Sequence, residues 1–516
     1  MEKQVAIDEL NRLKEVSRQM GGKERIERQH QRGHLTVRER IDRLFDAGSF
    51  VETGIMMQNL MPDREGKITH ISRVSGFGKI DGRTAIVQAD DATVSAGPGG
   101  RAGGGQSRGF NPRIYPENCY PIINLHDSGG DEAAPSMAAF GRPGVAYPTR
   151  ELVNLRKVPH VAAIMSDCLS ASALQAATAD FVVMVKGTSM ALCEPTMLGL
   201  ALEEESTPEE LGSWQLHDTV TGQVDAIAND DEHCLQIIRE FLSYMPSNCD
   251  EEPPYVPTAD PPDRKVERLM KLIPDKSNRV YDMYQVIKEI VDDGKYFSLK
   301  PYYAKALITC LARMNGKVVG IIANQTLHNA GAAGPDECDK ATSFICLCDS
   351  FNIPLIHLCD IPGFLVGRPA EKRKIPTKIM TWMEALALAT VPKITVIVRK
   401  AYGMGISNMC GPNCGPDFIS ALTTADISFM SPEAAANVVY ARKIEEAEDP
   451  EAEKGKLIKE MEYGNAPWEA AATGWLDDVL NPPDTRKYII DCLEIMHSRK
   501  NGFISNKQLQ SWPTGF

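Results

Sequence analysis

The fold is decided by the stretch Pro121-Ile122-Ile123-Asn124-Leu125-His126-Asp127, which runs into Ser128-Gly129-Gly130. Its pattern returns as Pro354-Leu355-Ile356-His357-Leu358-Cys359-Asp360, which runs into Ile361-Pro362-Gly363-Phe364. Each is a short apolar run that ends in aspartate and then reaches glycine. Such a run is typical of a buried strand with a turn at its carboxyl end, where open α/β sheets bind their ligands.

The two copies are separated by a constant offset. It is 354 − 121 = 233 residues for the first pair of prolines and 392 − 159 = 233 for Pro159 and Pro392, each of which precedes another apolar run. Further on, Ala179-Asp180-Phe181 is matched with Ala425-Asp426-Ile427, which assumes about a dozen extra residues in the second copy. The repeat predicts an α/β protein with two equivalent halves.

The length of 516 residues exceeds what one hydrophobic core usually organises. Residues 246–262 contain six prolines and the acidic run Asp250-Glu251-Glu252, which favours an extended connector. We therefore expect one domain over residues 1–250 and a second over residues 263–516.

The composition excludes several classes of protein. A net charge of −13 argues against binding of bulk nucleic acid or anionic membrane, and no apolar run approaches the roughly 18–20 residues that span a bilayer. The first thirty residues are charged and lack the apolar core of a signal peptide, so we expect a cytoplasmic protein. The thirteen cysteines have no metal-ribbon spacing, which favours reduced, mostly buried thiols and no metal site.

Local patterns predict individual elements. Apolar residues at helical spacing predict surface helices within residues 5–43 and further helices at residues 281–291 and 486–496. Alternating runs predict a hairpin around Asp81-Gly82 and another around Asn315-Gly316, since these dipeptides suit two-residue turns.

A glycine-rich segment covers residues 95–109. It includes Gly99, Gly100, Arg101 and Arg108. Its backbone N–H groups could approach an anion, although an ordinary surface loop is an alternative. It has no Gly-Lys-Ser/Thr pattern, so it is not a nucleotide P-loop.

Two further loops could stabilise negative oxygens. Residues 168–172 and 401–406 each follow a proline-led apolar run, and backbone N–H groups at such strand-to-helix turns can form oxyanion holes. Ordinary turns are an equally good reading from spacing alone. The sequence has no Gly-x-Ser-x-Gly or His-Glu-x-x-His signature, and its prominent histidines, His126, His217, His328 and His357, have no paired spacing. These histidines are better read as structural residues than as general bases.

At these residues the chain resembles a known family, the carboxyltransferase (β) subunits of biotin-dependent acyl-CoA carboxylases of the propionyl-CoA carboxylase type, together with related acyl-CoA decarboxylases. The resemblance covers nearly the whole length. Its markers include Gln29-His30-x-Arg32-Gly33, Asp127-Ser128-Gly129-Gly130, Ala312-Arg313-Met314-Asn315-Gly316, Asp360-Ile361-Pro362-Gly363-Phe364 and Arg399-Lys400-Ala401-Tyr402-Gly403.

The resemblance implies two crotonase-like ββα-superhelix domains, the first on the acyl-CoA side and the second on the biotin side. It implies an active site between the amino half of one subunit and the carboxyl half of another, in a hexamer. The implied reaction moves CO₂ from carboxybiotin to the α-carbon of an acyl-CoA through an enolate held by two oxyanion holes. No biotinyl-lysine motif or ATP-grasp loop occurs here, so biotin carboxylase and biotin carboxyl carrier functions are expected on partner chains.

The resemblance also assigns residues. It places Met404 and Gly405 at the biotin oxyanion hole, with Tyr402, Gly403, Ile406 and Ser407 around the cofactor, and Ser170 and Ala171 at the thioester oxyanion hole. For acyl-CoA it implies Gly129, Gly130, Gly99, Gly100, Arg101 and Arg108.

Three departures from the family pattern all fall in the acyl-CoA half. Residues 168–172 read Cys-Leu-Ser-Ala-Ser where relatives have Cys-Ala-Gly-Gly-Ala. Residues 131–135 read Asp-Glu-Ala-Ala-Pro where relatives have Ala-Arg-Ile-Gln-Glu-Gly. The glycine-rich residues 95–109 stand where relatives usually have a helix. The sequence therefore does not identify the acyl group of the substrate. A decarboxylase, or a divergent paralogue with another acceptor or a non-catalytic assembly role, is the alternative.

Overall fold

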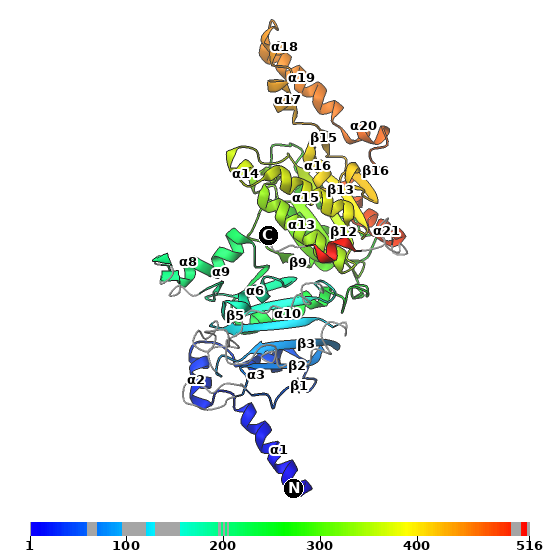
Figure 1. Ribbon diagram of the computed structural model, residues 1–516. Helices are drawn as coiled ribbons and strands as arrows, with labels where there is room; N and C mark the ends of the chain where they lie inside the picture. The colour runs from blue at the N-terminus through cyan, green and yellow to red at the C-terminus, as the bar shows by residue number, and fades with distance from the viewer. Residues whose placement is uncertain are drawn as a thin grey trace. The chain divides into compact units, whose positions relative to one another are not determined.

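The computed structural model describes residues 2–58, 70–94, 120–129, 155–193, 198–199, 202–203, 206–496 and 507–512. The chain forms two compact units, Met1–Glu251 and Glu252–Thr514 (Figure 1). Each unit is built on one mixed sheet with helices packed against it.

The first unit contains a sheet of eight strands in the order β1-β2-β3-β4-β5-β6-β8, with β7 paired to β5. Its elements are α1 (Lys3–Arg18), α2 (Lys23–Gln31), α3 (Val37–Leu44), β1 (Val51–Thr53), β2 (Arg73–Ile80), β3 (Arg83–Asp90), β4 (Ile122–Ser128), β5 (His160–Leu169), α6 (Ala171–Ala176), β6 (Phe181–Val185), β7 (Met190–Ala191), α8 (Pro208–Gly212), α9 (Trp214–Leu216), β8 (Ala226–Ala228) and α10 (Asp231–Tyr244). Strands β1 to β3 are antiparallel and the pairs from β3 onward are parallel.

The second unit repeats this plan with the order β16-β14-β13-β12-β11-β10-β9 and β15 paired to β13. Its elements are α11 (Leu269–Leu272), α12 (Met283–Ile290), β9 (Tyr296–Leu299), β10 (Leu307–Met314), β11 (Lys317–Asn324), α13 (Pro335–Ser350), β12 (Leu355–Ile361), α14 (Arg368–Lys372), α15 (Ile375–Leu388), β13 (Lys393–Tyr402), α16 (Met404–Asn408), β14 (Phe418–Leu422), β15 (Asp426–Ser428), α17 (Pro432–Val438), α18 (Ala441–Glu445), α19 (Pro450–Gly464), α20 (Pro467–Ala472), β16 (Asp478–Leu480) and α21 (Thr485–Met496). In Figure 1, α17 to α19 extend beyond the sheet of this unit.

The registers of the two sheets confirm the duplication. Ile122 lies opposite His160, and Leu355 lies opposite Lys393, so both strands of the pair keep the 233-residue offset. Even an irregularity is shared, because β4 shifts register against β5 between His126 and Ser128 as β12 does against β13 between Cys359 and Ile361. The predicted α/β class with two equivalent halves is thus confirmed.

One predicted correspondence is wrong. Phe181 lies opposite Val161, and its structural counterpart is Phe418, which lies opposite Ile394. The preceding aspartates agree, since the Asp180 carboxylate accepts a hydrogen bond from the His160 amide as the Asp417 carboxylate does from the Lys393 amide, at 2.9 and 2.8 Å. The offset there is 418 − 181 = 237, so the second copy has four extra residues. Asp426 belongs instead to β15, the counterpart of β7, because an Ala-Asp-apolar start is shared by several short strands of this fold.

The proline-rich segment after Glu251 is packed on the second unit. The Val256 amide donates to the Gly316 carbonyl at 3.0 Å, and a Cβ on Gly316 would lie 2.5 Å from the Tyr255 ring. Asp260 accepts a bidentate hydrogen bond from Arg264. Residues 252–262 therefore act as part of this unit's surface as well as a connector.

Most local predictions are confirmed. Helices α1 to α3, α12 and α21 and the hairpins β2–β3 and β10–β11 lie where the patterns place them, with positive φ angles at Asp81, Gly82, Asn315 and Gly316 as their turns require. The twelve cysteines of the described residues are all unpaired thiols and ten are buried, as expected. Within the described ranges, none of the helices is long and apolar enough to cross a membrane.

Candidate active site

The first candidate loop follows β13, which is buried along its whole length. Gly403 ends the strand with φ 54° and ψ −137°, a conformation that is essentially restricted to glycine, and α16 starts at the next residue. The Gly403 amide donates to the Ser428 carbonyl of β15 at 3.0 Å. This bond fixes the turn at the carboxyl end of the sheet.

The next two amides of this loop are free to bind a ligand. Met404 and Gly405 are the first residues of α16, so their N–H groups have no intrahelical acceptor, and none of the other described residues accepts from them. Met404 is 45% exposed, and a Cβ on Gly405 would lie 3.0 Å from the Ile361 side chain. The missing side chain at Gly405 leaves a cradle that suits a carbonyl oxygen with developing negative charge.

Buried side chains support this loop. Ile406 and Ser407 are buried, and the buried Tyr402 donates its hydroxyl to Asp426 of β15. Burial and the neighbouring Asp426 both raise the pKa of Tyr402, so the phenol stays a hydrogen-bond donor. Of the six second-half residues predicted for the site, Met404 and Gly405 present free amides and Gly403 shapes the turn, whereas the side chains of Tyr402, Ile406 and Ser407 are buried beside it.

A buried charge cluster lies beneath the same loop. Asp360, in the irregular end of β12, forms ion pairs with Arg399 at 3.1 Å and Lys400 at 3.5 Å and accepts from the Tyr281 hydroxyl at 2.8 Å. Burial lowers the pKa of Lys400, and Asp360 opposes that shift. Two cations pair with this one carboxylate, so these three groups carry a formal charge of +1, which the more distant Asp426, acting on Lys400, partly offsets.

The first-half loop has the same backbone but a different residue. Ser170 adopts φ 58° and ψ −124°, and its amide donates to the Ala191 carbonyl of β7 at 3.1 Å, as the Gly403 amide does to β15. This bond corrects the predicted donor pair, because the Ser170 amide is already engaged. The free amides of this loop are those of Ala171 and Ser172, which start α6.

Ser170→Gly is expected to stabilise the first unit by about 1 kcal/mol, since a non-glycine residue in this backbone region carries a strain of order 1–3 kcal/mol and the gain is partly offset by the greater freedom of glycine when unfolded. Denaturant unfolding measures the change. Gly403→Ser is the matched reverse substitution and should destabilise the second unit. A less stable Ser170→Gly protein would contradict the strain assigned here.

The electrostatics beneath the two loops differ. Asp127, the counterpart of Asp360, pairs with Arg40 at 2.8 Å, but Arg40 also pairs with Asp231 at 2.8 Å. The position equivalent to Lys400 is 400 − 233 = 167, which is an aspartate that accepts a hydrogen bond from Ser189 at 2.9 Å. The first-half loop therefore lacks the cationic support of the second.

The remaining predicted residues belong to the acyl-CoA side. Gly129 follows β4 and is partly exposed. Gly130, Gly99, Gly100, Arg101 and Arg108 lie outside the described residues. The sequence analysis did not assign the Ser172 amide as a donor and did not identify the Asp360 cluster. The 233-residue offset could have indicated Ser172, because it maps Ser170 onto Gly403 and therefore Ser172 onto Gly405.

Comparisons with known proteins identify the family of this chain. The family model "Carboxyl transferase domain" matches residues 28–510. Methylmalonyl-CoA decarboxylase subunit alpha of Propionigenium modestum is 36% identical over 513 residues, which are 97% of this chain and 98% of that protein. The propionyl-CoA carboxylase carboxyltransferase subunit of Haloferax mediterranei is 35% identical, with 96% of each chain covered.

A solved structure shows the same fold. It is the crystal structure of transcarboxylase 12S, described as a hexamer assembly with methylmalonyl-coenzyme A and methylmalonic acid bound. Its TM-score to this chain is 0.89 at 33% identity, with 98% of both chains covered. The match confirms the crotonase-like two-domain class expected from the sequence. The chain therefore belongs to the carboxyl transferase domain family.

Proposed function

We propose that the protein is the carboxyltransferase component of a biotin-dependent acyl-CoA carboxylase. The observation that carries this function is the pair of free amides at Met404 and Gly405, set above a cationic buried cluster in a chain of this family. These groups suit a reaction in which negative charge develops on oxygen and no nucleophilic side chain is needed.

The two loops have different roles, one toward biotin and one toward the acyl-CoA. Biotin, carried on a partner chain, would supply the carboxyl group, a ureido carbonyl and, once the carboxyl group has left, the basic nitrogen that takes the α-proton. The amides of Met404 and Gly405 hold that carbonyl oxygen, and the Asp360 cluster stabilises charge on it. The amides of Ala171 and Ser172 hold the thioester oxygen of the acyl-CoA, so that removal of an α-proton gives an enolate whose charge faces two N–H donors.

We further propose that the protein is a homo-oligomer, by analogy a hexamer. In it, the acyl-CoA loop of one subunit and the biotin loop of another subunit form each active site. The partner chains are a biotin carboxylase and a biotin carboxyl carrier. The unpaired, mostly buried cysteines agree with a cytoplasmic location.

Sedimentation is expected to show at least a dimer. A stable monomer with full activity would contradict the shared site.

Decarboxylation is the second candidate, because the relative from Propionigenium modestum is named as a methylmalonyl-CoA decarboxylase subunit and the same half-reaction runs backwards. A divergent paralogue that takes another acceptor or serves assembly is the third. Both directions use the same two loops, so the direction depends on the partner chains.

The test mixes the protein with a carboxybiotinylated carrier and a panel of acyl-CoAs and follows carboxyl transfer. We expect weak or no transfer to acetyl-CoA and propionyl-CoA, since the Cβ atoms of Ser170 and Ala171 narrow a loop that glycines form in relatives. Another acyl group should react. Propionyl-CoA turnover at an ordinary family rate would contradict the expected selectivity, and failure of every acyl-CoA to bind by calorimetry would contradict the function.

A further inference from the structure

A basic segment, residues 362–378, runs from the end of β12 through α14 into α15 in the second unit. It contains one acidic residue, Glu371, and five basic ones: Arg368, Lys372, Arg373, Lys374 and Lys378. Its formal charge is 5 − 1 = +4 in a chain whose net charge is −13. A cationic surface on an anionic protein attracts anionic partners to that place alone.

Both ends of the basic segment contact α16, the helix that begins with the free Met404 and Gly405 amides. At the first end, a Cβ on Gly405 would lie 3.0 Å from the side chain of Ile361, which directly precedes the segment. At the second end, α15 packs on α16, and the Asn408 side chain donates from Nδ2 to the Ile379 carbonyl at 2.9 Å (Figure 1). The segment therefore leaves the candidate biotin loop and returns to it.

Two of the five cations attach the segment to α13. Arg373 donates from Nη1 to Asp336 at 2.8 Å, and Lys378 forms an ion pair with Asp339; both acids lie in the first turns of α13. These pairs hold the segment in place and neutralise two of its charges.

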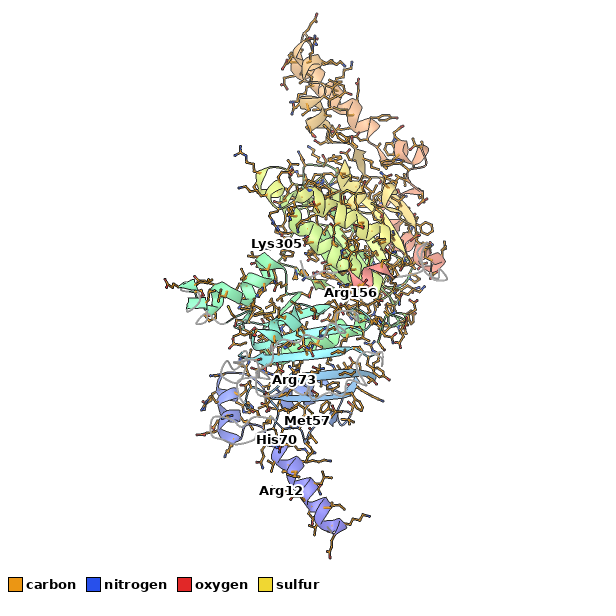
Figure 2. All side chains as sticks on the ribbon, in the orientation of Figure 1. Arg12, Met57, His70, Arg73, Arg156 and Lys305 are labelled. Atoms are coloured by element: carbon orange, nitrogen blue, oxygen red, sulfur yellow. The ribbon has the colours of Figure 1, made fainter. Side chains whose placement is uncertain are left out.

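The other three cations, Arg368, Lys372 and Lys374, are exposed and have no ion pair among the described residues. Figure 2 shows side chains of α14 projecting from the margin of the second unit. Because none of these three charges is used within the chain, all three can meet an anionic partner.

The backbone at Lys374 also points to a binding role. Lys374 adopts φ 59° and ψ 43°, the left-handed region that residues other than glycine and asparagine seldom occupy. The turn is fixed by a hydrogen bond from its amide to the Glu371 carbonyl at 3.0 Å and by the buried Ile375. Glycine would make this turn without strain, so the turn alone does not explain an exposed lysine here. Strained positions of this kind cluster at ligand-binding sites.

The position of the segment favours a partner protein over a small anion. In the proposed reaction, biotin reaches the Met404 and Gly405 amides on the lysine arm of a carrier chain. The folded part of that carrier then rests on the surface around the loop, where the basic segment lies. CoA also carries anionic phosphates, but the proposed function assigns the acyl-CoA to the loop of the first unit. An acidic face of the carrier is the better fit.

We propose that the basic segment is the docking surface for an acidic face of the biotin carboxyl carrier, with Arg368, Lys372 and Lys374 as its charged contacts. The inference rests on the proposed function and adds the surface that the carrier recognises. Exposed charges at the edge of an interface act mainly on the association rate and on its salt dependence. The segment is thus expected to affect how the carrier binds and not how the carboxyl group is transferred.

The test measures carboxyl transfer to the reactive acyl-CoA from the carboxylated carrier and, in parallel, from free carboxybiotin. The double variant Lys372→Glu/Lys374→Glu should raise the KM for the carrier by about 10–100-fold, the range for loss of electrostatic steering. Its kcat, its KM for acyl-CoA and its rate with free carboxybiotin should equal those of wild type. Added NaCl should raise the carrier KM of wild type and have little effect on that of the variant. Arg368→Glu should give a smaller rise.

Lys456→Glu/Lys459→Glu is the matched control, because it changes the net charge equally at two exposed lysines of α19. Its KM for the carrier should equal that of wild type. An unchanged carrier KM in Lys372→Glu/Lys374→Glu, or an equal rise in the control, would overturn the proposal and leave the proposed function standing. A rise in the KM for acyl-CoA alone would also overturn it and assign the segment to the CoA phosphates. Absence of transfer by wild type from both forms of biotin would overturn the function, and this inference with it.

Discussion

Gly405→Val is expected to lower kcat for carboxyl transfer by about 10²–10³-fold, the usual loss when one oxyanion-hole donor is removed. A Cβ at this position would lie 3.0 Å from Ile361 Cγ2, so the two further methyl groups of valine require the start of α16 or the end of β12 to move. Either movement turns the Met404 and Gly405 amides away from a common oxygen. Single-turnover transfer from a carboxylated biotin carrier measures the effect.

A matched control is Gly455→Val, in the middle of α19, where a Cβ meets nothing within 4 Å. It should transfer carboxyl at the wild-type rate. Both variants should keep the wild-type oligomer, since Gly405 is buried within its own unit's loop. If Gly405→Val also transfers at the wild-type rate, the biotin oxygen is held elsewhere.

The sequence predicted the strands of this site because their signals are local. The runs that end at Asp127 and Asp360 are apolar over a whole strand, and glycines that favour a turn follow within three residues. The hydrophobic pattern and the turn signal therefore predict the same strand end. The same logic failed for the pairing of Asp180 with Asp426. Several short strands of one sheet start with the same pattern, and the correct partner is identified only by the strand register and by the hydrogen bond from the His160 amide, both of which are tertiary features.

The donor pair at the first loop could not be read from the sequence, because it depends on a backbone hydrogen bond between residues that are distant along the chain. The bond from the Ser170 amide to the Ala191 carbonyl shifts the free amides by one residue. The Asp360 cluster could not be predicted from the sequence either, because Tyr281 lies 79 residues before the aspartate to which it donates. Motifs identified the family, and long-range contacts decide which atoms remain free.

Asp360→Asn is expected to lower the free energy of unfolding of the second unit by about 3–5 kcal/mol, the range for breaking a buried ion pair and leaving a charge unpaired. Asp360 is 0% exposed, and no second acid pairs with Arg399 among the described residues, so the amide leaves a guanidinium and an ammonium without a counter-ion. The Gly403 turn follows these residues directly, so carboxyl transfer should fall together with stability. Denaturant unfolding of the full chain, followed by transfer assays at low denaturant, measures both effects.

The duplication supplies the control for this prediction. Asp127→Asn makes the same substitution at the equivalent position, but Arg40 keeps its second ion pair with Asp231, and Gln29, which donates to Asp127 at 2.9 Å, can still donate to the new amide oxygen. The loss is therefore the charged hydrogen bond from Arg40, worth about 1.5–3 kcal/mol. The two variants share fold position, burial and chemistry and differ in how many cations depend on the aspartate. A loss for Asp127→Asn equal to or larger than that for Asp360→Asn would show that the cluster beneath the Gly403 turn is not the electrostatic support assigned to it.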